Sequence, residues 1–138
     1  MVMLYLPDTN AFSRYLRRSD ARLVEMMNLH LPDLRLSVIV LAELEYGAAK
    51  RRDVPAFARR VETLRSLVDG APFLDEDAIE FGKIRAHLET LKPNAQLIGG
   101  FEMLIAAQAV RMGATLVTGN TREFARVPGL LLENWQDV

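Results

Sequence analysis

Short apolar runs alternate with amphipathic stretches along this chain of 138 residues. The runs at 2–7, 34–40, 71–74, 114–118 and 130–133 are short and mostly aliphatic, which predicts buried strands. Helical periodicity occurs at 9–18, in a second stretch that starts at 19, and at 41–52, 55–69, 75–91 and 101–112. Residues 119–126 are predicted to form a turn with a short helix. Such alternation predicts an α/β fold in three layers, with a mostly parallel sheet between helices.

The stretch at 101–112 is apolar on nearly every side, which is typical of a buried helix. Gly99 and Gly100 precede it and Gly113 follows it. A charged residue near its start, Glu102, therefore needs a compensating partner such as the helix N-terminus, a cation or water.

The composition excludes several kinds of chemistry but does not identify a binding partner. The chain has 17 basic and 18 acidic residues, a formal charge of -1 and no cysteine. Disulfides, thiolate metal sites and cysteine nucleophiles are therefore excluded, and a metal site would rely on hard oxygen ligands. We expect both histidines, His30 and His87, to be structural.

We expect one domain over residues 1–138, because no internal repeat or linker-like stretch interrupts the pattern. The first residues lack a basic segment, and the apolar run at 2–7 is too short for a signal peptide or a membrane span. These features predict a cytoplasmic protein without a membrane segment.

Polar residues follow several of the predicted strands, at the edge where parallel α/β sheets bind ligands. Asp8 follows the first strand, Glu43 lies early in the helix after the second, Glu102 begins the buried helix, and Asn120 and Glu123 follow the fourth strand. If these acidic side chains converge, their repulsion implies a bound cation, and incomplete oxygen coordination favours Mg²⁺ or Mn²⁺.

Each acid also has a structural alternative. Asp8 is a good N-cap for the helix that follows it, and Glu43 and Glu102 are placed to interact with helix dipoles in first turns. The metal-site hypothesis therefore depends on whether these side chains meet in space.

Four segments in this order, together with the C-terminal end, resemble the PIN-domain toxins of the VapC family. The segments are YLPDTN at 5–10, AELEYG at 42–47, IGGFEMLIAA at 98–107 and LVTGNTREF at 116–124, followed by RVPGL at 126–130 and LENW at 132–135. The resemblance covers the whole chain. It implies a PIN fold with about five parallel strands, a Mg²⁺- or Mn²⁺-dependent endoribonuclease that leaves 5′-phosphate and 3′-hydroxyl ends, a cognate VapB antitoxin, and a homodimer.

By position in these segments, Asp8, Glu43 and Glu102 match the first, second and third acids of the family, and Asn120 and Glu123 share the region of the fourth. The family more often has aspartate at the third position and frequently an acid where Asn120 stands. The resemblance thus implies Asp8, Glu43, Glu102 and Asn120 as catalytic residues, Asp8, Glu102, Glu43 and Glu123 as metal ligands, and Thr9, Asn10, Thr118 and Thr121 as residues that orient ligands or water.

Local basic clusters are the candidates for RNA binding, since the net charge is close to zero. They comprise Arg14, Arg17, Arg18 and Arg22, and Lys50, Arg51 and Arg52; solvated helix surfaces are the alternative interpretation. The resemblance also implies an apolar groove for an antitoxin segment, and the candidates to line it are Phe12, Tyr15, Leu16, Met26, Met27 and Phe57.

Three other functions fit parts of the pattern. A phosphotransferase with an aspartyl nucleophile also has Asp after its first strand, but it needs a second Asp where this chain has Asn10. A PIN fold weakened at Glu102 and Asn120 can survive as a noncatalytic RNA- or antitoxin-binding module. PIN nucleases outside toxin pairs process cellular RNA.

Overall fold

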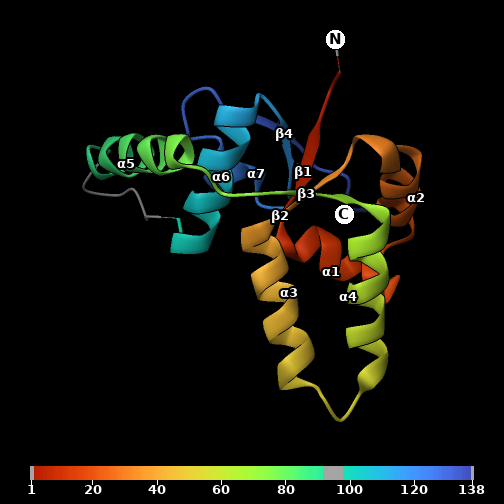
Figure 1. Cartoon of the computed structure of the whole chain (residues 1–138). Helices are drawn as coiled ribbons and strands as arrows, with labels where there is room; N and C mark the ends of the chain where they lie inside the picture. The colour runs from red at the N-terminus through yellow and green to blue at the C-terminus, as the bar shows by residue number, and fades with distance from the viewer. Residues whose placement is uncertain (1, 92–97, 138) are drawn as a thin grey trace.

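The computed structural model describes residues 2–91 and 98–137 (Figure 1). The strands are β1 (Tyr5–Pro7), β2 (Arg35–Ser37), β3 (Asp69–Ala71), β4 (Thr115–Val117) and β5 (Leu131–Glu133). The helices are α1 (Thr9–Arg17), α2 (Ala21–Leu29), α3 (Val38–Lys50), α4 (Pro55–Leu67), α5 (Asp75–Glu89), α6 (Gly100–Met112) and α7 (Thr121–Phe124), with a 3-10 turn at Leu31–Asp33. The predicted α/β alternation is confirmed.

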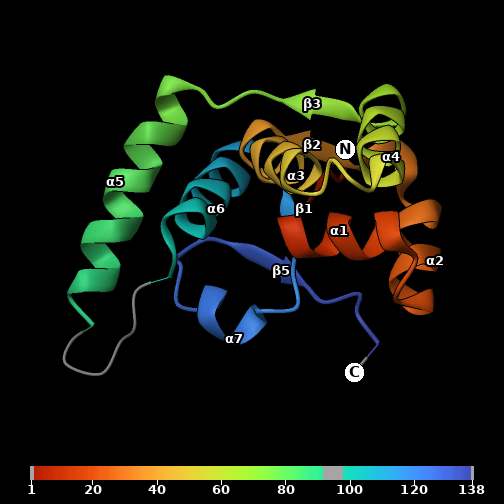
Figure 2. The same cartoon turned by 90° about the horizontal axis from the view of Figure 1, so that it is seen from below.

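The strands are all parallel, but they form two sheets in place of one. One sheet has the order β1-β4-β5, and the other pairs β2 with β3. An isolated parallel bridge between Tyr5 and Leu34 joins the two sheets where β1 meets the start of β2. The carboxyl ends of the strands therefore face the same side of the molecule, the side seen in Figure 2.

Helices flank the strands on both sides, as the three-layer prediction requires. Helices α5 and α6 lie on one side, and α1, α2 and α4 lie on the other, while α3 and α4 form a long hairpin that extends past the carboxyl ends (Figures 1 and 2). The loops and helix starts that follow the strands therefore lie together at the carboxyl ends of the strands.

The strand predicted at 34–40 ends three residues early. Ser37 caps α3, with its hydroxyl oxygen accepting a hydrogen bond from the backbone N–H of Ile39 at 3.1 Å. The cap overrides the strand preference of the β-branched residues that follow, so α3 begins at Val38. Glu43 consequently lies in the second turn of α3, and the first-turn dipole role considered for it is wrong.

The third strand lies at 69–71, not at 71–74, for a similar reason. Leu74 is the N-cap of α5, and its backbone N–H donates to the carboxylate of Asp77 at 2.8 Å. The first strand is also shorter than predicted, since Val2 and Met3 are exposed and only 5–7 pair with β4.

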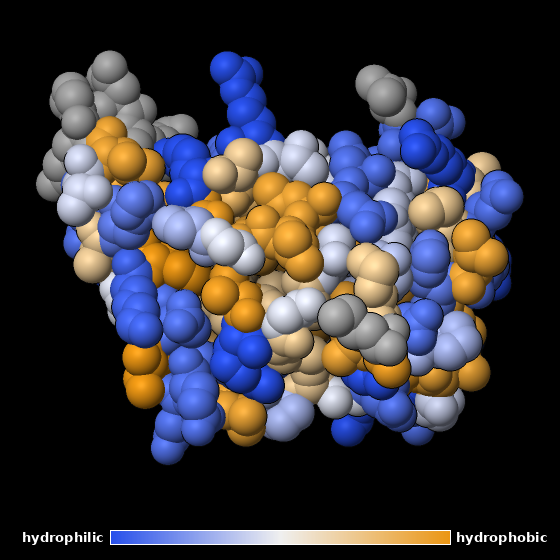
Figure 3. All heavy atoms as spheres, turned by 90° about the horizontal axis from the view of Figure 1, so that it is seen from above, coloured by the Kyte–Doolittle hydropathy of each residue, from blue (hydrophilic) through white to orange (hydrophobic). Residues whose placement is uncertain are grey.

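Helix α6 is buried on nearly every side, as predicted, because Met103 and all five residues from 105 to 109 are buried. Ile105, Ala106 and Ala109 are fully or almost fully buried, whereas Phe101 keeps 54% of its surface exposed. On the face drawn in Figure 3, apolar side chains occur in several groups with polar side chains between them. Among the described residues, no helix is both long enough and apolar enough to cross a membrane.

Two polar links, one buried and one partly buried, tie α6 to its neighbours, and the apolar pattern did not reveal them. The Gln108 side chain accepts from the Ser37 hydroxyl and donates to the carbonyl of Ala71 at 2.8 Å. Arg111 donates to both carboxylate oxygens of Asp77, at 2.6 and 2.9 Å. These links fix α6, and so Glu102, relative to the ends of β2 and β3.

Candidate active site

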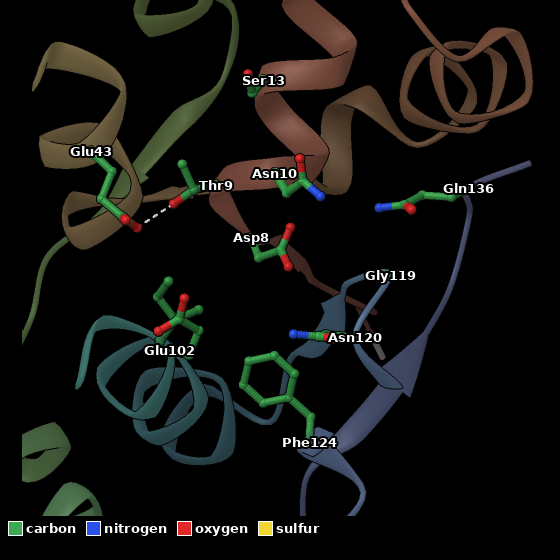
Figure 4. A pocket seen from close by; sticks show the side chains of 11 residues that line it. Asp8, Thr9, Asn10, Ser13, Glu43, Glu102, Gly119, Asn120, Phe124 and Gln136 are labelled. Atoms are coloured by element: carbon green, nitrogen blue, oxygen red, sulfur yellow. Dashed lines mark hydrogen bonds between the residues drawn. The ribbon is translucent and has the colours of Figure 1, made fainter. Parts of the chain in front are cut away.

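A cavity of about 490 Å³ opens at the carboxyl ends of β1 and β4 (Figure 4). Segments far apart in the sequence meet here: the start of α1, the second turn of α3, the start of α6, the loop after β4, and the C-terminal tail. The lining residues are Asp8, Thr9, Asn10, Ser13, Glu43, Glu102, Ile105, Gly119, Asn120, Phe124 and Gln136. The structure thus brings together the four predicted catalytic residues, with Thr9 and Asn10.

Asp8 is held at the junction of β1 and α1. Its backbone N–H donates to the carbonyl of Val117 at 2.9 Å, and its carboxylate accepts from the N–H of Ala11 at 2.8 Å, which caps α1. Burial raises the pKa of this carboxyl, and the nearby charges of Glu102 and Glu43 raise it further, while hydrogen bonding from Thr118 and Ala11 opposes the shift. Asp8 therefore sits where negative charge is not fully compensated by the protein.

Glu43 reaches the cavity from α3 and is half-buried. The hydroxyl of Thr9 donates a hydrogen bond to its Oε1 (Figure 4). This contact joins α1 to α3 and aims one carboxylate oxygen of Glu43 toward the start of α1.

Glu102 lies in the first turn of α6, as predicted. Its carboxylate folds back over Gly99, the N-cap of this helix, and Oε2 occupies the space that a Cβ at position 99 would need. A glycine at 99 therefore permits Glu102 to lie against the positive end of the helix dipole while still facing the cavity.

Asn120 follows β4 and lines the cavity, but the other predicted residues of this segment do not. Thr118 is buried behind it and accepts a hydrogen bond from the Asn120 N–H at 3.0 Å. Thr121 begins α7 and Glu123 lies in the first turn of that helix; neither is among the lining residues. The structure therefore does not bring Glu123 to the acidic cavity as a fourth ligand.

Two polar residues that line the cavity were not predicted from the sequence. Ser13 lies one helical turn after Asn10 on α1, and an i, i+3 argument from Asn10 would have found it. Gln136 comes from the C-terminal tail, after the last strand, where no periodicity or strand-end rule points to it.

The donor chemistry of the cavity suits a hard divalent cation. Asp8, Glu43 and Glu102 offer carboxylate oxygens and Asn120 an amide oxygen, the ligands that Mg²⁺ and Mn²⁺ accept. In the described part of the chain, no three acidic or histidine side chains already stand close enough together to hold a metal ion. Glu43 and Glu102, which contact Thr9 and Gly99, would have to turn toward Asp8 to complete such a site.

A model of the family described as PIN domain matches residues 5–130. Over 135 residues the chain is 32% identical to Ribonuclease VapC2 of Rickettsia felis, covering 96% of this chain and 98% of that protein. Over 137 residues it is 34% identical to the tRNA(fMet)-specific endonuclease VapC of Shigella flexneri, covering 97% and 99%. This chain belongs to the VapC family of PIN-domain ribonucleases.

Solved structures of the VapC family agree with this fold. The chain superimposes with a TM-score of 0.87 on a chain of VapBC2 from Rickettsia felis bound to a promoter DNA fragment, at 30% identity, covering 97% of this chain and all of that one. DNA-bound VapBC from Salmonella typhimurium gives the same TM-score and identity, covering 97% and 99%. The PIN fold expected from the motifs is confirmed.

None of the seven basic residues considered for RNA binding lines the cavity of this VapC-family chain. Arg14 lies 3.6 Å from the buried carboxylate of Asp20, and Arg17 stacks on the ring of Phe57 at 5.4 Å from its centroid. The others, Arg18, Arg22, Lys50, Arg51 and Arg52, are exposed. Their contribution to RNA binding stays a prediction.

The prediction of an apolar groove for an antitoxin segment is wrong for most of the residues named in it. Phe12, Leu16, Met27 and Phe57 are core residues, because α1, α2 and the α3–α4 hairpin pack on one another. Neither His30 nor His87 lines the cavity. The ring of His30 packs between Tyr5 and Trp135, with centroid distances of 4.7 and 5.0 Å, and His87 is exposed on α5, away from the cavity.

Proposed function

We propose that this protein hydrolyses RNA phosphodiester bonds in a reaction that needs Mg²⁺ or Mn²⁺. One observation carries the proposal: carboxylates from three separate elements, Asp8, Glu43 and Glu102, line one cavity, and the charges of the two glutamates help to raise the pKa of Asp8. Carboxylates that repel one another in a partly buried pocket are stabilised by a cation.

Asp8 and Glu102 would be the principal ligands of the metal ion, and Glu43 would bind through water or to a second ion. A bound ion supplies two things to this reaction: it lowers the pKa of a coordinated water and neutralises charge that builds up on the phosphate. Asp8 is suited to its role because β4 and the first turn of α1 fix its position.

The remaining polar residues would act on the substrate and on the acids. Asn10 and Asn120 present carboxamides to the cavity (Figure 4), which can donate hydrogen bonds to phosphate oxygens. Thr9 would orient Glu43 through their hydrogen bond, and Thr118 would support Asp8 and the backbone of Asn120.

We also propose that the protein is the toxin of a toxin–antitoxin pair, inhibited by a VapB-like antitoxin and acting on RNA in the cytoplasm. Support comes from two similar structures that contain VapC with VapB, from Rickettsia felis and Salmonella typhimurium. A homodimer is the expected assembly of the toxin itself.

The test compares RNA cleavage by the wild type and three variants, with Mg²⁺ or Mn²⁺ and with EDTA. Asp8→Asn should lose at least a hundredfold in rate, and EDTA should abolish wild-type cleavage. Asp53→Asn, an exposed acid in the turn between α3 and α4, is the matched control and should cleave normally. Undiminished cleavage by Asp8→Asn would refute the proposed site, and faster cleavage by Glu102→Asp would show that the additional methylene lowers activity.

A noncatalytic binding module is the second candidate, since the acids do not already form a metal-binding cluster within the described residues. Titration with Mn²⁺ separates the two functions. An enzyme should bind Mn²⁺ in a manner that depends on Asp8, whereas a module should bind RNA with unchanged affinity and show no Mn²⁺ binding at millimolar concentration.

A further inference from the structure

The side chain of Gln136 enters the cavity from the C-terminal tail, on the side of Asn10 and Asn120 (Figure 4). Its amide nitrogen Nε2 is buried and has no hydrogen-bond partner among the described residues. A buried N–H donor without an acceptor costs free energy, so folded proteins rarely retain one unless something else binds it. The other buried carboxamide described here, Gln108, has its donor and its acceptor both satisfied.

The tail around Gln136 is firmly held, so this position is imposed by the fold. The ring of Trp135 is buried, packs against Tyr5 at a centroid distance of 5.1 Å, and donates to the Glu133 carboxylate at 2.9 Å. On the other side, the N–H of Asp137 donates to the buried carboxylate of Asp20 at 3.1 Å. Gln136 therefore lies between two anchors.

Gly119 supplies the space that the Gln136 amide occupies. A Cβ built on Gly119 would lie 2.6 Å from Nε2 and 2.5 Å from Oε1 of Gln136, too close for any side chain there. The amide thus lies directly over the loop that carries Asn120, and both face the cavity.

The cavity has two chemically different walls. Asp8, Glu43 and Glu102 form an acidic wall, and Asn10, Asn120 and Gln136 form an amide wall (Figure 4). A phosphate group is repelled by the acidic wall in the absence of a cation, but it accepts hydrogen bonds from amide N–H groups. The unpaired donor at Nε2 is therefore matched to an anionic acceptor.

We propose that Nε2 of Gln136 donates a hydrogen bond to a phosphate oxygen of the RNA strand in this cavity, which makes Gln136 a substrate-binding residue. The proposal rests on the proposed ribonuclease function and adds a contact from the C-terminal tail to it. A contact of this kind strengthens binding of the strand, so its loss should affect KM more than kcat.

The test uses two replacements that keep the size of the side chain. Gln136→Met removes the donor, and Gln136→Glu replaces it with a negative charge. We expect the dissociation constant for a short single-stranded RNA, measured at low salt in EDTA, to rise roughly tenfold for Met and more for Glu. In cleavage assays with metal, KM should rise in the same order with little change in kcat, and thermal stability should not fall for Met.

Gly119→Ala provides an independent perturbation, because its Cβ displaces the Gln136 amide; it should weaken RNA binding as Gln136→Met does. Gly82→Ala, in open space on α5, is the matched control and should bind normally. If Gln136 only fills space over Gly119, Gln136→Met will bind RNA like the wild type, and the proposal is overturned. Equal binding by Gln136→Glu also overturns it, because a contact with an anion cannot tolerate that charge.

Failure of the proposed function would look different. A wild-type protein that neither binds nor cleaves RNA would overturn both proposals together. Normal wild-type cleavage that depends on Asp8, combined with unchanged affinity in all Gln136 variants, would overturn only the contact from Gln136.

Discussion

Asp8 combines two roles whose energetic demands conflict. As the N-cap of α1 it needs only an oxygen acceptor for the Ala11 N–H, whereas as a metal ligand it attracts the cation most strongly when it carries a negative charge. Burial and the neighbouring Glu102 and Glu43 raise the pKa of this carboxyl, so the folded state holds its proton more tightly than the unfolded chain. Its contribution to stability is therefore more favourable below the raised pKa and is lost above it. Above its raised pKa the charge of Asp8 destabilises the fold.

We predict that Asp8→Asn abolishes cleavage and yet raises the melting temperature in EDTA at pH 7. Asparagine keeps the capping oxygen and removes the charge, for a gain on the order of 1 kcal/mol, or a few degrees for a domain of this size. Asp20→Asn is the control, because that carboxylate accepts from the N–H groups of Leu23 and Asp137 and lies near Arg14, so its neutralisation should lower the melting temperature. A lower melting temperature for Asp8→Asn than for the wild type would contradict the prediction.

Sequence reasoning at the residue scale found all three acids of the acidic wall and two amides of the amide wall, Asn10 and Asn120, but not Gln136. Asp8, Glu102 and Asn120 follow strands or lie at helix starts, and the rule for strand ends in parallel sheets finds such positions. Glu43 lies one turn further along, in the helix that follows β2. Gln136 follows no such rule, since its place depends on where the tail is pinned by Trp135 and Asp20, which are long-range contacts.

At the scale of elements, capping decided the boundaries that hydrophobic patterning missed. Val38, Ile39 and Val40 favour a strand by composition, but the Ser37 cap draws them into α3. The same local chemistry sets the start of α6. Gly99 and Gly100 look equivalent as breaks between elements, yet only Gly99 lies under the Glu102 carboxylate.

These two adjacent glycines offer a matched pair of variants. Gly99→Ala should force the Glu102 carboxylate from its place at the start of α6 and reduce kcat/KM for RNA cleavage about tenfold or more, because the position of this proposed ligand is changed. Gly100→Ala meets open space and should cleave normally, with unfolding free energy unchanged or up to about 1 kcal/mol higher. Urea unfolding checks that both variants fold, and equal cleavage by the two would refute this role of Gly99.

At the scale of the whole molecule, the alternation of elements correctly predicts parallel strands with helices on both sides. It does not predict that the sheet divides, because the single bridge between Tyr5 and Leu34 depends on packing between segments distant in sequence. Nor does it reveal the pair between the buried Asp77 and Arg111, because nothing in the alternation of apolar and polar positions links residue 77 to residue 111. That pair and the Gln108 hydrogen bonds connect α5, α6 and the β2–β3 sheet. We call these connected elements the frame, because they hold the helix that carries Glu102.

The pair Asp77–Arg111 should make the stability of the whole molecule depend on acid pH. Burial of Asp77 alone would raise its pKa, but the hydrogen bonds from Arg111 and from the Leu74 N–H, with the charge of Arg111, outweigh burial and lower it. A carboxyl with a lowered folded pKa contributes stability above its unfolded pKa, about 3.9, and this contribution is lost as pH falls through the folded value. Asp77→Asn should therefore cost about 3 kcal/mol at pH 7, because the buried carboxylate that pairs with the partly exposed Arg111 is lost, and much less near pH 2.

Urea unfolding of the wild type and Asp77→Asn from pH 7 to pH 2 measures this difference. The contribution of Asp8 has the opposite sign but is common to both proteins, so it cancels when their unfolding free energies are subtracted. Asp75→Asn, an exposed acid in the same first turn of α5, should change stability by less than about 0.5 kcal/mol at every pH. A difference between wild type and Asp77→Asn that stays constant down to pH 2 would show that ionisation of Asp77 does not stabilise the frame. In that case the orientation of α6 would depend on the Gln108 hydrogen bonds and apolar packing alone.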